Sequence, residues 1–300
     1  MLAKVKQLRI VVSRHSAFYS PLIATLAGGF LNEEGLDASY RALAAGESSH
    51  WLLARAEADI IQSAVSTNWA AMERGESNLP AHFAQINCRD GFFLVSRRVQ
   101  QGFSWRSLEG ATLLADHAFQ PLAMLKYAGH CQGVDWTRVR LVDAGPPDRI
   151  AAAFRAGEGD YAHLQGPAAQ QIECEGAGHV VADVGRAMPP VAFSSLMATR
   201  DFLARQEAAA FMRAYLKARQ WVRTAPAKQI CEALLPWFAE FSPAALEAAI
   251  QRYQLLGCWE GGAEIPRDLY EQALTVFLHS GAIKRRWPYE VVVAPPPGKI

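Results

Sequence analysis

Residues 8–30 read LRIVVSRHSAFYSPLIATLAGGF, and this stretch decides the fold. Its first five residues form an apolar, β-branched run that is typical of a buried strand. Ser20 followed by Pro21 predicts the N-cap and first turn of a helix, and the glycine pair near the end of the stretch predicts where that helix stops. Because strand, loop and helix in succession form the repeating unit of α/β folds, the stretch predicts an α/β protein.

The loop between this strand and this helix is polar and aromatic. It carries Arg14, His15 and Tyr19, with hydroxyls at Ser13 and Ser16. In open α/β sheets, ligands collect at the loops that leave the carboxyl ends of strands. A cation, an imidazole, hydroxyls and flat rings suit a small polar or anionic ligand. We therefore expect part of a ligand site here, with an ordinary surface loop as the alternative.

Length and composition narrow the class of protein. The chain has 300 residues, 51% hydrophobic and 20% charged, with a formal net charge of +1, so it has room for two domains. Near-neutral charge argues against a nucleic-acid partner. No apolar run reaches the roughly 18–20 residues of a membrane span, so we expect no direct membrane insertion.

The expected location depends on the N-terminus and the cysteines. The opening residues, MLAKVKQLRIVV, lack the apolar core and cleavage site of a secretory signal. This predicts a cytoplasmic protein for the chain as given, or a periplasmic one if a signal has been removed. Five widely spaced cysteines without a CxxC motif predict free thiols and no metal site.

The strand–helix rhythm runs through the first half, restarts near Trp105 and gives way to helices after residue 199. The strand candidates are residues 37–43, 58–64, 81–86 and 91–96, then 111–115, 139–144, 160–164 and 179–184; the final helices are 201–223, 228–238, 242–256 and 266–280. We expect a discontinuous first lobe, 1–97 with 193–300, and a second lobe, 98–192. A cleft between two such lobes binds small molecules and closes by hinge motion.

Four motifs point to a known family. They are GGFLNEEGLDASY at 28–40, Ala58-Asp59-Ile60 ahead of the third strand, Ser107-Leu108-Glu109-Gly110, and the long block at 133–167 that ends in GDYAHLQGP. In this order and spacing they resemble bacterial solute-binding proteins of the thiamine-pyrimidine-precursor, nitrate, sulfonate and taurine group. The resemblance runs from about residue 8 to residue 223.

The resemblance implies a bilobed periplasmic-binding-protein fold of the second topological type, with a helical C-terminal third. It implies a ligand bound between the lobes and a membrane permease of an ABC transporter as partner. From the residue types we expect that ligand to be small and planar or anionic, and we expect no cofactor and no metal. The ligand-binding residues that the resemblance implies are Arg14, His15, Tyr19, Ser49, His50, Ser66, Thr67, Asn68, His117 and Gln165.

Two positions depart from the family pattern. Ala111-Thr112 replaces a basic residue that usually follows the third motif, and Asp116-His117 replaces a small Gly/Ser/Thr pair. The second departure argues against a backbone-amide cradle for an anion of the kind that binds sulfonate.

Enzymes also use this fold, among them a pyrimidine-synthesis protein and an aromatic sulfinate desulfinase. The first loop has no cysteine nucleophile and the chain has no cysteine-rich run, which disfavours both activities. A Ser16–His15–Asp116 arrangement and a transition-metal site among the histidines near strand ends stay open. The leading hypothesis is a solute-binding protein of the ABC-transporter type; the alternative is a cytoplasmic enzyme or sensor for a heteroaromatic or sulfur-containing metabolite.

Overall fold

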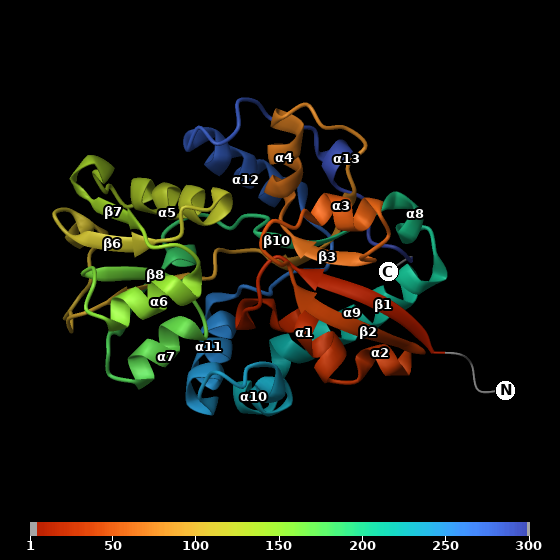
Figure 1. The fold of residues 1–300 in the computed structure, drawn as a ribbon, viewed down its shortest axis with the longest axis horizontal. Helices are drawn as coiled ribbons and strands as arrows, with labels where there is room; N and C mark the ends of the chain where they lie inside the picture. Colours follow the sequence, from red (N-terminus) through yellow and green to blue (C-terminus); the bar gives the residue numbers. More distant parts are fainter. Residues whose placement is uncertain (1–4, 299–300) are drawn as a thin grey trace.

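The structure is a computed structural model that describes residues 5–298. The first four and last two residues lie outside the described residues, so the expectation about a secretory signal falls partly on residues that the structure does not describe. Residues 5–298 contain two five-stranded sheets with helices packed around them, arranged as two lobes (Figure 1). The expected bilobed α/β class is confirmed.

The first sheet has the strand order β2-β1-β3-β10-β4. Its strands are β1 (Lys6–Val12), β2 (Leu36–Ala42), β3 (Ile60–Ser63), β4 (Ala81–Asn87) and β10 (Ser194–Ala198). Strand β1 pairs in parallel with β2 and β3, whereas β10 runs antiparallel to both β3 and β4. The loops that follow β1 and β3 therefore leave the same edge of the sheet.

The second sheet repeats this plan in the order β7-β6-β8-β5-β9. Its strands are β5 (Phe92–Ser96), β6 (Thr112–Ala115), β7 (Arg140–Asp143), β8 (Tyr161–Gln165) and β9 (His179–Asp183). Strand β6 is parallel to β7 and β8, and β5 is antiparallel to β8 and β9.

One boundary of the expected division is wrong. We expected the first lobe to extend through residue 97, but β5 (Phe92–Ser96) pairs with β8 and β9 of the second sheet. All five residues of this strand, FFLVS, are buried. The chain crosses between the sheets before β5 and returns before β10. We therefore propose lobes of 5–90 with 193–298 and of 91–192.

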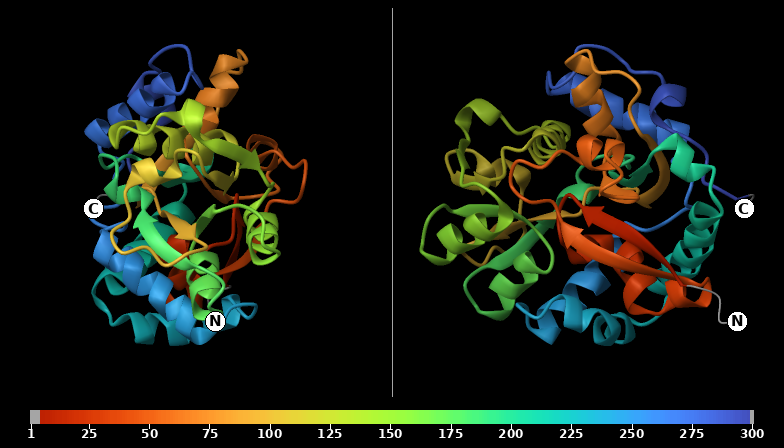
Figure 2. Two further views of the ribbon diagram at one scale, coloured as in Figure 1. Left: turned by 90° about the vertical axis from the view of Figure 1, so that its left-hand side faces the viewer. Right: turned by 45° about the vertical axis from the view of Figure 1, so that its right-hand side comes forward.

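Helices fill the space around both sheets. They are α1 (Ser20–Ala27), α2 (Phe30–Glu33), α3 (Ser49–Ala54), α4 (Val65–Glu73), α5 (Phe119–Cys131), α6 (Pro147–Arg155), α7 (Ala168–Cys174), α8 (Arg200–Leu203), α9 (Gln206–Thr224), α10 (Ala227–Leu234), α11 (Pro243–Leu256), α12 (Arg267–His279) and α13 (Tyr289–Val292). Helix α9 packs on α1 and α2, α11 packs on α7, and α12 packs on α5. The C-terminal helices thus contact both lobes from two sides (Figures 1 and 2).

Local sequence signals explain the start of α11 but not the start of α1. Ser242 caps α11 by accepting the N–H of Ala245, Pro243 occupies the first turn, and Gly257 ends the helix in the left-handed conformation. Ser20 differs from expectation, because it is the first residue of α1 and not its cap. Its hydroxyl donates to the carbonyl of Ala17, in a 3-10 turn that Ser16 caps.

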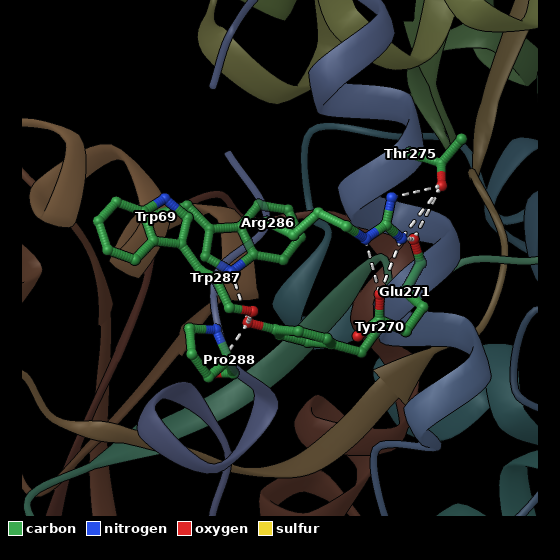
Figure 3. A network of polar contacts seen from close by, with 7 residues as sticks. All are labelled: Trp69, Tyr270, Glu271, Thr275, Arg286, Trp287 and Pro288. Atoms are coloured by element: carbon green, nitrogen blue, oxygen red, sulfur yellow. Dashed lines mark hydrogen bonds and ion pairs between the residues drawn. The ribbon is translucent and has the colours of Figure 1, made fainter. Parts of the chain in front are cut away.

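Helix α4 is anchored to the C-terminal segment by a polar network (Figure 3). The indole Nε1 of Trp69 donates to the hydroxyl of Tyr270 (2.9 Å), which in turn donates to the carbonyl of Trp287 (2.9 Å). Beside it, Arg286 forms an ion pair with Glu271 (2.7 Å). This anchoring fixes the helix whose first turn contributes to the site described below. No helix within residues 5–298 is long and apolar enough to cross a membrane.

Candidate functional site

A cavity of about 230 Å³ lies between the two lobes, at the carboxyl ends of strands. Its walls are the loop after β1, the end of β3 with the start of α4, the end of β8, and the start of α5. The lining residues are Ser13, Arg14, Tyr19, Gln62, Ser63, Ala64, Ser66, Thr67, Phe92, Ala118, Phe119, Gln120, Pro121, Gln165, Phe193 and Ser194. We call this space the cleft cavity.

An ion pair spans the two lobes at the cleft cavity. Arg14, after β1, donates from Nη2 to Oδ2 of Asp116, which follows β6. The other oxygen of Asp116 accepts the backbone N–H of Ala118 (2.7 Å). Nη1 of Arg14 is buried without a hydrogen-bond partner. Arg14 therefore keeps a free donor while its charge is matched by Asp116.

A second polar link between the lobes lies at the two helix starts. Ser66 in the first turn of α4 donates to Oε1 of Gln120 in the first turn of α5 (2.7 Å), and Nε2 of Gln120 donates to the carbonyl of Phe193 (2.8 Å). Thr67 shares a hydrogen bond with Ser63 (2.7 Å). Ala64 and Ala118, the N-cap residues of these two helices, line the cavity, so the positive ends of both helices adjoin it.

Tyr19 and Gln165 provide buried neutral groups. The hydroxyl of Tyr19 faces the side chains of Gln165 and Gln62, and burial raises the pKa of this tyrosine, so it stays protonated and can donate. Gln165 is 4% exposed, and its Oε1 is buried without a partner. An unpaired buried acceptor is costly unless something outside the chain donates to it.

His163 lies behind the cavity, on β8. Its ring stacks on Phe92 at 4.2 Å between centroids, and neither ring nitrogen has a hydrogen-bond partner. Burial, with the nearby charge of Arg14, lowers the pKa of His163 to about 3. The imidazole is therefore neutral and forms an aromatic wall behind Phe92.

Of the ten ligand-binding residues expected from the sequence, the structure brings five together around the cleft cavity: Arg14, Tyr19, Ser66, Thr67 and Gln165. Ser49, His50, Asn68 and His117 do not line it. His50 bonds to Asn68 (2.9 Å), and the amide of Asn68 donates to the carbonyl of Pro80, so both are paired inside the first lobe. His117 points to Asp143 at 3.9 Å.

His15 faces away from the cleft cavity. Its Nε2 lies 2.7 Å from the carbonyl of Trp237 and its Nδ1 lies 2.9 Å from the hydroxyl of Tyr40, so Nε2 donates and Nδ1 accepts. Its ring stacks on Phe238 at 4.4 Å. These contacts tie the first loop to the C-terminal helices. His15 does border a second cavity, of about 440 Å³, which shares Arg14 and Gln165 with the first.

Ser16, His15 and Asp116 do not form the catalytic triad that the sequence left open. Ser16 donates to the carbonyl of Gly166 (2.8 Å), both nitrogens of His15 are engaged elsewhere, and Asp116 pairs with Arg14. Within residues 5–298, no group of three or more His, Cys, Asp or Glu side chains is placed to hold a metal ion.

Sequence reasoning missed several lining residues. Gln62 and Ser63 lie at the end of β3, where a glutamine inside the apolar run ADIIQSA was an available signal. Gln120 lies one residue into α5. Phe92 and Phe193 flank the points where the chain crosses between the lobes, and no local pattern marks them.

Comparison with known proteins gives the family. The "Putative binding protein YtlA" of Bacillus subtilis (strain 168) is 30% identical over 296 residues, which cover 97% of this chain and 88% of that protein. The ligand-binding component of an ABC-type import system from Staphylococcus aureus, solved with zinc bound, has a TM-score of 0.75 at 14% identity and covers 97% of both chains.

A further solved structure, the periplasmic aliphatic sulphonate-binding protein SsuA of Escherichia coli, has a TM-score of 0.71 at 13% identity and covers 96% of this chain and 97% of its own. No family model matches the chain. The relatives support the binding-protein hypothesis over the enzyme alternative. The chain belongs to the family of binding proteins that includes YtlA, and it shares the fold of the solute-binding components of ABC import systems.

Proposed function

We propose that the cleft cavity binds one small planar or anionic solute, which the protein delivers to a membrane permease. The observation that carries this proposal is the cavity itself, which takes walls from both lobes and from strand ends and helix starts. Its volume of about 230 Å³ is below the range of roughly 300–1,000 Å³ typical of drug-sized ligands. A single ring with few substituents matches this size.

The lining suits such a ring. Phe92, Phe119, Phe193 and Tyr19 provide flat apolar faces. Serine and threonine hydroxyls and the amides of Gln62, Gln120 and Gln165 surround them, so a ligand edge that both donates and accepts hydrogen bonds finds partners. The free Nη1 of Arg14 adds a charged donor.

The partner and the location are part of the same proposal. A two-lobed protein that closes over a solute presents a different surface when loaded, which a permease can recognise. The Staphylococcus aureus neighbour is named as part of an import system, and the Escherichia coli neighbour is named as periplasmic. We infer that this protein acts on the outer side of the cytoplasmic membrane.

The test is a binding screen by thermal shift, followed by calorimetry, over pyrimidines, aromatic carboxylates and alkyl sulfonates. We expect a hit to bind one to one, and Gln165→Ala and Arg14→Ala to weaken it by about tenfold or more, since each removes a buried hydrogen bond to the solute. Gln251→Ala, at an exposed glutamine on α11, is the matched control. A hit that binds both cleft variants as tightly as the wild type contradicts the proposal.

A further inference from the structure

The carboxylate of Asp116 occupies an unusual position. Its residue is 6% exposed, at the lobe junction beside the cleft cavity. Oδ1 accepts the N–H of Ala118, the N-cap residue of the thirteen-residue helix α5. Oδ2 accepts from the guanidinium of Arg14, which belongs to the other lobe. One side chain is thus bonded to a helix N-terminus and to a cation at the same time.

These two partners are the groups that proteins use to bind a free anion. A helix N-terminus offers backbone N–H groups and positive potential, and a guanidinium offers charge-assisted donors. Among the described residues that line the cleft cavity, Arg14 alone is charged. Because Asp116 forms an ion pair with Arg14, the site as a whole carries no net charge that would attract an anionic ligand.

We propose that Asp116 is a tethered anion that occupies the anion position of the cleft and thereby selects the charge of the solute. The inference rests on the proposed function and narrows its ligand class. The solute is a neutral or zwitterionic planar ring with donor and acceptor groups on its edge. It is not a compound held mainly by a sulfonate, sulfate or carboxylate group.

Two physical effects make Asp116 a strong selector. A tethered group competes with free anions at an effective concentration in the millimolar range or above, so dilute anions do not displace it. An anionic ligand that enters beside it meets a like charge a few ångströms away, in a site that solvent screens poorly. A neutral ring meets neither obstacle and can still accept from the free Nη1 of Arg14.

The experiment removes the tethered anion and supplies a free one. Asp116→Ala and the wild type are titrated with ethanesulfonate and with its neutral counterpart ethyl methyl sulfone, by calorimetry and thermal shift. We expect ethanesulfonate to bind Asp116→Ala at least about tenfold more tightly than the wild type and to raise its melting temperature. The sulfone should not distinguish the two proteins.

Asp268→Ala removes an exposed aspartate from the first turn of α12 and controls for the change in net charge. The inference is overturned if ethanesulfonate binds the wild type and Asp116→Ala with equal affinity. It is also overturned if Asp268→Ala raises the affinity for ethanesulfonate as much as Asp116→Ala does. If Asp116→Ala does not fold, Asp116→Asn takes its place, since its carbonyl can still accept the N–H of Ala118, and the same criteria apply.

The outcomes separate this inference from the proposed function. If cytosine or another neutral ring binds the wild type but Asp116→Ala gains no anion binding, the charge-selecting role of Asp116 fails alone. If no ring compound binds while Asp116→Ala gains ethanesulfonate, the proposed ligand class fails and the role of Asp116 stands.

Discussion

Helix α4 contributes to two polar regions that differ in one respect. At its middle, Trp69 belongs to the network of Figure 3, in which the indole N–H, the Tyr270 hydroxyl and the Arg286 guanidinium all have partners within the chain. At its start lies the cleft cavity, where Arg14 and Gln165 each keep a buried polar atom without a partner. The paired groups of the network stabilise the fold, whereas we propose that the two unpaired atoms at the cleft cavity bind the ligand.

The largest effect on stability is expected from removing Trp69, which tests whether the paired network stabilises the fold. This side chain is fully buried and touches Tyr270 and Phe277, so we expect Trp69→Ala to lower the free energy of unfolding by about 3–5 kcal/mol. Trp51→Ala is the matched control, because Trp51 is 63% exposed, and it should cost less than about 1 kcal/mol. Urea unfolding measures both. Equal losses would show that the network is not a stabilising region.

The next effect depends on pH and concerns Asp90, at the crossing between the lobes. Its Oδ1 accepts the N–H of Phe92 (2.6 Å), its Oδ2 is buried without a partner, and burial raises its pKa from 3.8 to about 7. Between these values the folded protein binds more protons than the unfolded chain, so this group destabilises the fold progressively as the pH rises from about 4 to 7.

Asp90→Asn has no such titration. The unfolding free energy of the wild type minus that of Asp90→Asn should therefore fall between pH 4.5 and pH 7.5, as measured by urea titration at several pH values. Working with the difference cancels the opposite trend from His163 and His82, whose pKa values burial lowers to about 3. If the difference between the two unfolding free energies stays constant or rises with pH, the pKa of Asp90 is not raised in the folded protein.

Removing His15 should have a smaller effect on stability, and it also tests the contrast between paired and unpaired polar groups. Because both of its nitrogens are paired within the chain, we expect His15→Ala to cost about 1–3 kcal/mol of stability by leaving Tyr40 and the Trp237 carbonyl unpaired. Ligand affinity should change by less than about twofold. A variant that is as stable as the wild type but loses the ligand would place His15 in the binding site, as the sequence first suggested.

The smallest effect on stability is expected at Gln165. Its Oε1 has no partner to lose, so Gln165→Ala should change the free energy of unfolding by less than about 1 kcal/mol, although it weakens ligand binding. Thermal unfolding with and without a hit from the screen separates the two effects. A large loss of stability without ligand would mean that Gln165 is structural.

The fold was predictable because its signals are local and repeated. Apolar strand runs, helix caps and the restart near Trp105 identify two α/β lobes. The strand Phe92–Ser96 was assigned to the wrong lobe because its sequence shows that it is buried but not which strands it pairs with. Pairing over 60 or more residues depends on tertiary structure, which no short pattern encodes.

The site was predictable only in part, for a related reason. The loop after β1 was identified because ligands collect at strand ends, and the loops after β3 and β8 were identified from the resemblance to solute-binding proteins. In the first loop two neighbouring side chains point to different sides: Arg14 lines the cleft cavity, while His15 packs on Phe238. Likewise Asp116 pairs with Arg14 while His117 turns to Asp143. Residue type cannot decide between such neighbours; backbone orientation does.

The central claim is that the solute lies in the cleft cavity between the lobes. A crystal structure of the protein with a hit from the screen tests it most directly. The account predicts a ring lying against Phe92, bonded to Nη1 of Arg14 and to the side chain of Gln165, with Asp116 still on Arg14. Density for the hit in the second cavity, or on the outer surface with the cleft cavity empty, would contradict it.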